Sequence, residues 1–129
     1  MLDKTNSIQF ASPAEIKAYQ EKRLITEMEY LAHRSVFYQR MFQEKKIDWS
    51  KITKLEDLKR IPLTTKEDLQ RHNDEFLCVP REEIIDYVTT SGTLGDPVTF
   101  ALTESDLQRL AFNEELSFTT AGCSGKDIM

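Results

Sequence analysis

The chain has 129 residues, enough for one folded domain, and its 40% hydrophobic and 30% charged content is typical of a globular protein. A net charge of −5 without a basic stripe argues against a nucleic-acid partner. Short apolar runs argue against a membrane span or a secretory leader. Cys78 and Cys123 lie far apart in the sequence, so we expect free thiols in a reducing cytoplasm.

An amphipathic helix is predicted near the N-terminus. Ser12 can cap it, Pro13 suits its first turn and Glu15 can complete a capping box. The apolar spacing extends the helix over residues 13–33. Its apolar face is formed by Leu24, Met28 and Leu31.

A second helix is predicted over residues 36–45, with Ser35 as its cap. Its apolar side belongs to an aromatic group that we interpret as helix-packing core. The alternative interpretation is a wall of an aryl-acid pocket or a homodimer contact. The group comprises Tyr30, Phe37, Tyr38 and Phe42.

Two shorter helices are predicted over residues 54–60 and 65–73. The run Thr53–Glu56 has the pattern of a capping box, and Pro62 disfavours helix in the residues just before it. The run Thr64–Glu67 has the composition of a further helix start.

A short β-hairpin near residues 84–102, followed by a helix, is predicted in the last third of the chain. The segments Ile84–Thr90 and Val98–Leu102 are rich in β-branched and aromatic residues, as strands are. Thr103 can cap a helix over residues 104–120.

The loop between the two strands, Thr90–Pro97, has the composition of an anion-binding turn. Its two glycines permit close approach of the backbone, and its hydroxyl groups are donors that suit phosphate oxygens. The same residues also suit a plain hairpin turn. The common nucleotide P-loop is excluded, because Gly95 is followed by Asp96 where that motif requires lysine.

A family resemblance favours the phosphate interpretation. Thr90–Pro97 resembles the serine-glycine-threonine loop of the adenylate-forming enzymes, and its flanks resemble the phenylacetate–CoA ligase family in particular. The resemblance runs from about Leu24 to the C-terminus. The flanking segments that carry it are Phe37–Arg40, Leu55–Leu58, Ile61–Leu69 and Leu102–Leu107.

The resemblance implies a mostly α-helical portion of an α/β enzyme. Residues 1–80 would form a helical lead-in, and residues 81–129 would begin the adenylate-forming domain. Asp127–Met129 looks like the start of another strand, which would leave an unpaired edge. We therefore expect this chain to be the N-terminal part of a longer protein.

The activity implied by the resemblance is that of an ATP-dependent aryl-acid CoA ligase. Acid, ATP and CoA would give acyl-CoA, AMP and pyrophosphate through an acyl-adenylate, with Mg²⁺ as the metal of the parent enzyme. The backbone amides of Gly92–Gly95 would hold the β- and γ-phosphates. The phosphate-binding residues implied in this way are Thr90, Ser91, Gly92, Thr93, Leu94 and Gly95.

Two positions depart from the family pattern. Leu94 replaces a threonine that many members carry, and Asp96 replaces a lysine. Like charges repel, so Asp96 must point away from a bound triphosphate or bind it through a metal ion. No catalytic residue is assigned, because the adenine, acid and C-terminal elements would lie downstream. We expect the chain alone to be inactive and to bind no cofactor tightly.

Two alternatives stay open. The chain could be a small helical interaction module whose turn only resembles the ATP loop, or part of another adenylate-forming enzyme that loads a carrier protein. No metal site is predicted, since zinc needs about four convergent ligands. The histidines and cysteines, which form no close group in the sequence, are His33, His72, Cys78 and Cys123.

Overall fold

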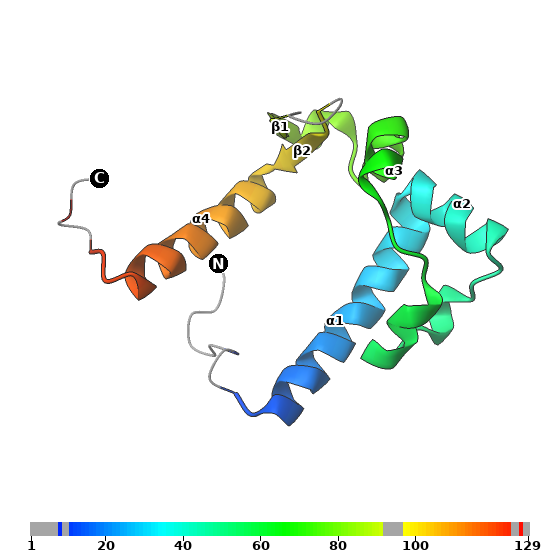
Figure 1. Ribbon diagram of the computed structural model, residues 1–129, viewed down its shortest axis with the longest axis horizontal. Helices are drawn as coiled ribbons and strands as arrows, with labels where there is room; N and C mark the ends of the chain where they lie inside the picture. Colours follow the sequence, from blue (N-terminus) through cyan, green and yellow to red (C-terminus); the bar gives the residue numbers. More distant parts are fainter. Residues whose placement is uncertain (1–7, 9–10, 92–96, 125–126, 128–129) are drawn as a thin grey trace. The chain divides into compact units, whose positions relative to one another are not determined.

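The computed structural model of the chain describes residues 8, 11–91, 97–124 and 127. These residues belong to two compact units, Met1–Cys78 and Val79–Met129. The first unit is helical, whereas the second contains a two-stranded antiparallel sheet and one long helix (Figure 1). The prediction of a mostly helical chain with one short hairpin is therefore confirmed.

The first unit opens with helix α1, Pro13–Arg34. Its start is the predicted capping box: the Ser12 hydroxyl accepts from the Glu15 amide at 3.4 Å, and the Glu15 carboxylate accepts from the Ser12 amide at 2.8 Å. These bonds satisfy backbone donors that a helix start leaves without partners.

Ser35 joins α1 to the next helix, α2, which spans Val36–Glu44. Its amide donates to the Leu31 carbonyl at the end of α1, while its hydroxyl accepts from the Tyr38 amide at the start of α2. A single residue thus ends one helix and begins the other, as the predicted cap at Ser35 requires.

The core of the first unit forms where α1 and α2 meet the segment after them. Met28, Phe42 and Ile52 are buried together. The side chains packed around them are partly buried: Leu24, Ala32, Tyr38, Ile47, Trp49 and Ile61. Burial of apolar area is the main stabilising contribution here, at roughly 25 cal/mol per Å².

The rest of the first unit consists of short helices, with 3₁₀ helices labelled η: η2 at Trp49–Lys51, η3 at Leu55–Arg60, α3 at Lys66–Arg71 and η4 at Asn73–Phe76. The helix predicted over residues 54–60 is present as a 3₁₀ helix. The helix predicted over 65–73 ends at Arg71 and is followed by η4. Short 3₁₀ turns are common where a chain has only a few residues between breaks.

The predicted capping box at Thr53–Glu56 is wrong by one position. The carboxylate of Asp57, not that of Glu56, accepts from the amides of Thr53 and Lys54, at 3.1 and 3.0 Å. Asp57 stands three residues after Lys54, where a side chain can reach back to the cap. These amide donors lower the pKa of the Asp57 carboxyl.

The second unit contains a short 3₁₀ helix, η5 (Arg81–Glu83), before strands β1 (Ile84–Thr89) and β2 (Thr99–Thr103). The strands pair antiparallel, as predicted, with an irregularity between Ile84 and Asp86. Helix α4, Glu104–Thr120, follows β2 directly. The predicted cap Thr103 is confirmed: its hydroxyl accepts from the Asp106 amide at 3.3 Å.

Helix α4 ends in a Schellman motif. Gly122 has a φ of 88°, its amide donates to the Thr119 carbonyl, and the Cys123 amide donates to the Phe118 carbonyl. Glycine suits this left-handed position because it has no Cβ. Among the described residues, no helix has both the length and the apolar character needed to cross a membrane.

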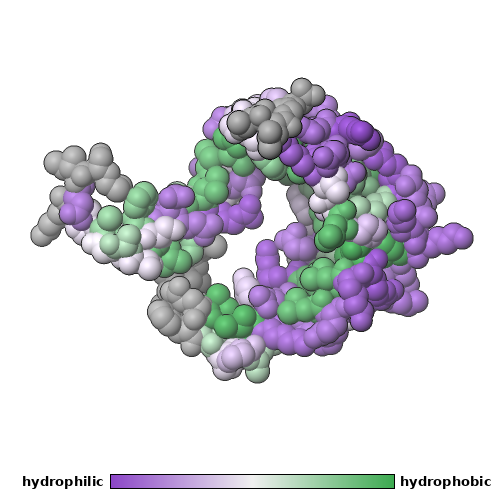
Figure 2. All heavy atoms as spheres, viewed as in Figure 1, coloured by the Kyte–Doolittle hydropathy of each residue, from purple (hydrophilic) through white to green (hydrophobic). Residues whose placement is uncertain are grey.

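Large apolar side chains remain exposed in the second unit. Among the described residues of this unit, Val98 is the buried hydrophobic one, at 2% exposure. In Figure 2, apolar atoms are visible along α4, where Leu110 and Phe118 are exposed. The exposed set on the hairpin is Ile85, Tyr87, Val88 and Phe100. This unit therefore covers little of its own apolar surface.

Candidate functional site

The predicted phosphate loop begins after the end of β1 and ends just before β2. Thr90, Ser91 and Pro97 are exposed at its two ends. Gly92, Thr93, Leu94 and Gly95, with Asp96, lie outside the described residues. The described geometry of this site is therefore that of the base of the loop.

Thr90 and Val98 are held together by two hydrogen bonds. The Thr90 amide donates to the Val98 carbonyl at 3.0 Å, and the Val98 amide donates to the Thr90 hydroxyl oxygen at 3.0 Å. The last ladder pair before them is Thr89 with Thr99. The two ends of the loop are thus fixed to each other by one backbone and one side-chain contact.

Val98 is absent from the residues predicted for the site, although it holds the base of the loop. An apolar residue directly after Pro97 indicates the start of a strand. That signal does not reveal a bond to the Thr90 side chain, because the bond depends on strand register and not on local composition.

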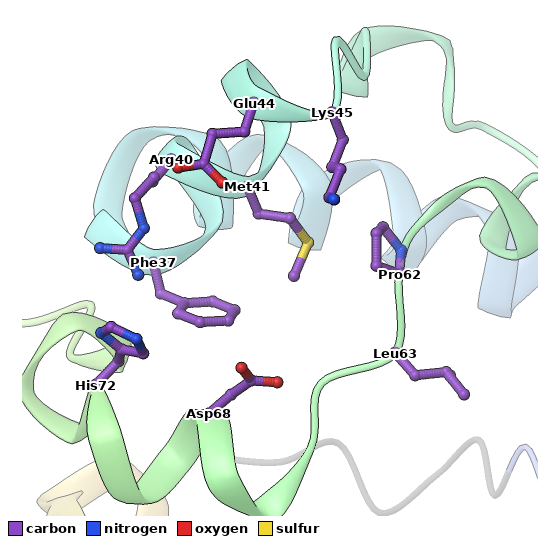
Figure 3. A pocket seen from close by; sticks show the side chains of 9 residues that line it. All are labelled: Phe37, Arg40, Met41, Glu44, Lys45, Pro62, Leu63, Asp68 and His72. Atoms are coloured by element: carbon purple, nitrogen blue, oxygen red, sulfur yellow. The ribbon is translucent and has the colours of Figure 1, made fainter.

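A hollow on the first unit is a second candidate region. It has a volume of about 340 Å³ and is bordered by α2, α3 and the segment at Pro62 (Figure 3). Its lining residues are Phe37, Arg40, Met41, Glu44, Lys45, Pro62, Leu63, Asp68 and His72. Of the predicted aromatic group, Phe37 is the member that lines it.

Three members of the aromatic group belong to the packing core, as predicted, whereas Tyr30 is exposed at 41% and the prediction is wrong for it. Phe37 and Phe42 are buried, and the rings of Phe37 and Phe76 stack at a centroid distance of 4.1 Å. The Tyr38 ring meets Phe37 edge to face at 5.5 Å, in the geometry that aromatic pairs prefer. The aryl-pocket interpretation of this group stays a prediction.

Two of the cationic or titratable side chains beside this hollow, Arg40 and His72, are paired with Glu75. The Glu75 carboxylate accepts a hydrogen bond from His72 Nδ1 at 2.9 Å and forms an ion pair with the Arg40 guanidinium. The hydrogen bond to His72, followed by the charge of Arg40, lowers the pKa of Glu75. Donors from Thr65 likewise lower the pKa of Asp68, whose carboxylate completes the cap of α3.

Within the described part of the chain, neither the base of the loop nor the hollow contains a group of side chains that could bind a metal ion. No group of three or more His, Cys, Asp or Glu side chains there is arranged to hold a metal ion. The Mg²⁺ implied by the family resemblance therefore has no ligands that can be assigned to described residues. Glu82, Glu83 and Asp86, which cluster before and within β1, are exposed to solvent.

Most of the chain is similar in sequence to one group of enzymes. No family model matches it. It is 38% identical over 109 residues to the phenylacetate–coenzyme A ligase of Thermus thermophilus. This match covers 84% of this chain and 24% of that enzyme. It is 32% identical over 126 residues to the Escherichia coli enzyme of the same name, covering 96% of this chain and 29% of the relative.

Solved structures give the same picture. A 2-hydroxyisobutyryl-CoA ligase in complex with 2-HIB-AMP and CoA matches with a TM-score of 0.72 and 29% identity, over 79% of this chain and 23% of that chain. The same ligase in its postadenylation state with 2-HIB-AMP matches with a TM-score of 0.71 and 28% identity, over 78% of this chain and 22% of that chain.

The chain spans about a quarter of the length of these relatives. The match nevertheless extends over most of its own residues, including the segments that carry the family resemblance. By sequence, this chain is related to one part of the phenylacetate–coenzyme A ligases, and its fold is similar to one part of a 2-hydroxyisobutyryl-CoA ligase.

Proposed function

We propose that this chain is the N-terminal, phosphate-binding part of an ATP-dependent aryl-acid CoA ligase. The observation that carries the proposal is the base of the loop: Thr90 and Val98 fix the two ends of a glycine-containing segment between two strands. That segment is the one whose sequence resembles the phosphate loop of adenylate-forming enzymes.

The parent reaction has two steps. The carboxylate of the acid attacks the α-phosphorus of ATP, which forms an acyl-adenylate and releases pyrophosphate. The CoA thiol then attacks the acyl carbon and displaces AMP. In the first step, backbone amides of Gly92–Gly95 would hold the β- and γ-phosphates and stabilise charge on the leaving pyrophosphate.

The residues of this chain would bind and orient the nucleotide without taking part in bond making. Ser91 and Thr93 would add hydroxyl donors to the backbone amides. Mg²⁺, when bound to the triphosphate, supplies charge neutralisation; none of the described residues is assigned to it. The adenine, acid and CoA sites would lie in the remainder of the parent, so the isolated chain is expected to be inactive.

Two features suit the proposed compartment and the proposed place of this chain in a larger protein. Cys78 and Cys123 are free thiols, which suits the reducing cytoplasm where metabolic ligases act. The exposed apolar side chains of the hairpin and of α4 suit a unit that packs against further protein.

A titration tests the proposal on the chain as it exists. Amide NMR signals are followed while ATP, and separately inorganic triphosphate, are added at millimolar concentration. We expect both ligands to shift the signals of Thr90, Ser91 and Val98, because both carry the phosphate groups that the loop would bind. Gly92→Val should abolish the shifts by adding bulk to the loop, whereas Gly125→Val, outside the loop, should leave them intact.

Two results would contradict the proposal. If triphosphate causes no shifts, or if Gly92→Val leaves them unchanged, the loop is a plain turn and the interaction-module alternative is favoured. Phenylacetate-dependent exchange of pyrophosphate into ATP by the chain alone would refute the expectation that it is catalytically incomplete.

A further inference from the structure

The pair Thr90 and Val98 departs from ordinary strand pairing at the base of the loop. In a hydrogen-bonded antiparallel pair, two residues exchange both backbone bonds. Here the Thr90 amide makes its ordinary bond to the Val98 carbonyl, but the Val98 amide donates to the Thr90 side chain at 3.0 Å. The hydroxyl of Thr90 thus takes the place of its own carbonyl.

This exchange ends the ladder without leaving the Val98 amide unpaired. Val98 is 2% exposed, and a buried amide without a partner is costly. The Val98 amide is thus paired with the side chain of Thr90 and not with its carbonyl. The hydroxyl oxygen is already engaged as an acceptor, which gives this side chain a structural task independent of any ligand.

We propose that Thr90 is a positioning residue: its hydroxyl oxygen fixes the ends of the phosphate loop by accepting from the Val98 amide. The inference deepens the proposed function and rests on it, since the loop matters for catalysis only if it binds phosphate. It adds a structural role to the direct phosphate binding that the family resemblance implies for Thr90.

Three variants of the 129-residue chain test the role of Thr90. Thr90→Val keeps the shape and the β-branched character but removes the oxygen. Thr90→Ser keeps the oxygen. Thr89→Val, one residue earlier on the same strand, is the matched control, since Thr89 is exposed. For each variant, hydrogen exchange of the Val98 amide and affinity for inorganic triphosphate are measured by NMR.

We expect Thr90→Val to accelerate exchange at Val98 by about fivefold, the factor for loss of one hydrogen bond of typical net strength. Triphosphate affinity should fall by about the same factor, because the loop ends are no longer fixed. Thr90→Ser should keep both values within about twofold of the original chain, and Thr89→Val should change neither.

The two readouts separate the possible failures. If Thr90→Val weakens triphosphate binding while Val98 exchange is unchanged, Thr90 contacts phosphate directly and the inference is overturned. If Thr90→Ser fails to restore Val98 protection, the hydroxyl is not the partner and the inference is overturned as well. If the original chain binds no triphosphate, the proposed function fails, whereas Val98 exchange still decides whether Thr90 holds the hairpin end.

Discussion

The Ser35 hydroxyl donates a hydrogen bond to the backbone carbonyl of Glu75, at 3.1 Å and across 40 residues of sequence. Ser35 has 0% exposure. The same oxygen accepts from the Tyr38 amide at the start of α2. One buried hydroxyl therefore links the junction of α1 and α2 to η4, which lies near the C-terminal end of the first unit.

Ser35→Ala should destabilise the first unit by about 1–3 kcal/mol, because it removes a helix cap and leaves a carbonyl without its donor. Urea unfolding followed by the fluorescence of Trp49 measures this, since Trp49 is the single tryptophan and belongs to the first unit. Ser50→Ala is the control, because Ser50 is exposed and its hydroxyl bonds only to nearby Asp48. Equal midpoints for the two variants would show that the Ser35 contact contributes nothing.

Lys46 adopts a left-handed conformation, with a φ of 53°, directly after α2. Its amide donates to the Gln43 carbonyl, and the Ile47 amide donates to the Phe42 carbonyl at 2.8 Å. This is a Schellman motif with a lysine at the position where glycine is preferred. The backbone of a side-chain-bearing residue is strained there by roughly 1–2 kcal/mol.

Lys46→Gly should therefore raise the free energy of unfolding by about 0.5–1 kcal/mol, since relief of strain exceeds the added entropy of glycine in the unfolded chain. Lys45→Gly is the matched control: Lys45 has a φ of −88° and gains no relief. We expect this neighbour to lose stability instead. The Trp49 unfolding curve measures both variants, and a loss of stability in Lys46→Gly as large as that in Lys45→Gly would contradict the strain argument.

Helix starts were predictable because their signals are local. Ser12, Ser35 and Thr103 each carry the cap that their sequence context indicates. The capping box near residue 54 was misassigned because two acidic residues, Glu56 and Asp57, compete for one position. Only the backbone conformation decides which carboxylate reaches the free amides.

Long-range contacts were not predictable in this way. The bond from Ser35 to Glu75 and the stacking of Phe37 on Phe76 join segments far apart in sequence. At the candidate site, composition indicates which residues suit phosphate, but the bond from Val98 to Thr90 follows from the register of β1 and β2. A single-residue slip would point Thr90 to the opposite face and remove that bond.

Asp106 makes the second unit sensitive to acid. Amide and hydroxyl donors of Thr103 lower the pKa of its carboxyl, and Arg109 adds to the shift. The unfolded value is about 3.9. Because the folded pKa is depressed, this carboxylate stabilises the unit above the unfolded value, and the contribution is lost as pH falls through the folded pKa.

Asp106→Asn should flatten the dependence of the second unit's stability on pH below about 4, since the amide does not titrate. Glu82→Gln is the control, because Glu82 is exposed before β1. Carboxyl-carbon NMR gives the midpoint of Asp106 directly, and amide exchange in α4 at several pH values reports stability. An Asp106 midpoint above the unfolded value would reverse the predicted sign.

Val88 and Phe100 are opposite each other in the hairpin, and both are exposed, at 42% and 43%. Adjoining apolar side chains of this kind form a patch that binds hydrophobic dyes, whereas single exposed apolar residues are common and inert. Replacing both with threonine keeps strand propensity and should lower the fluorescence of bound anilinonaphthalene sulfonate. Leu63→Thr is the control, since Leu63 is 90% exposed but lies in the first unit. Because dye binding depends on contiguous apolar surface, an equal decrease in the control would show that the hairpin pair forms no patch.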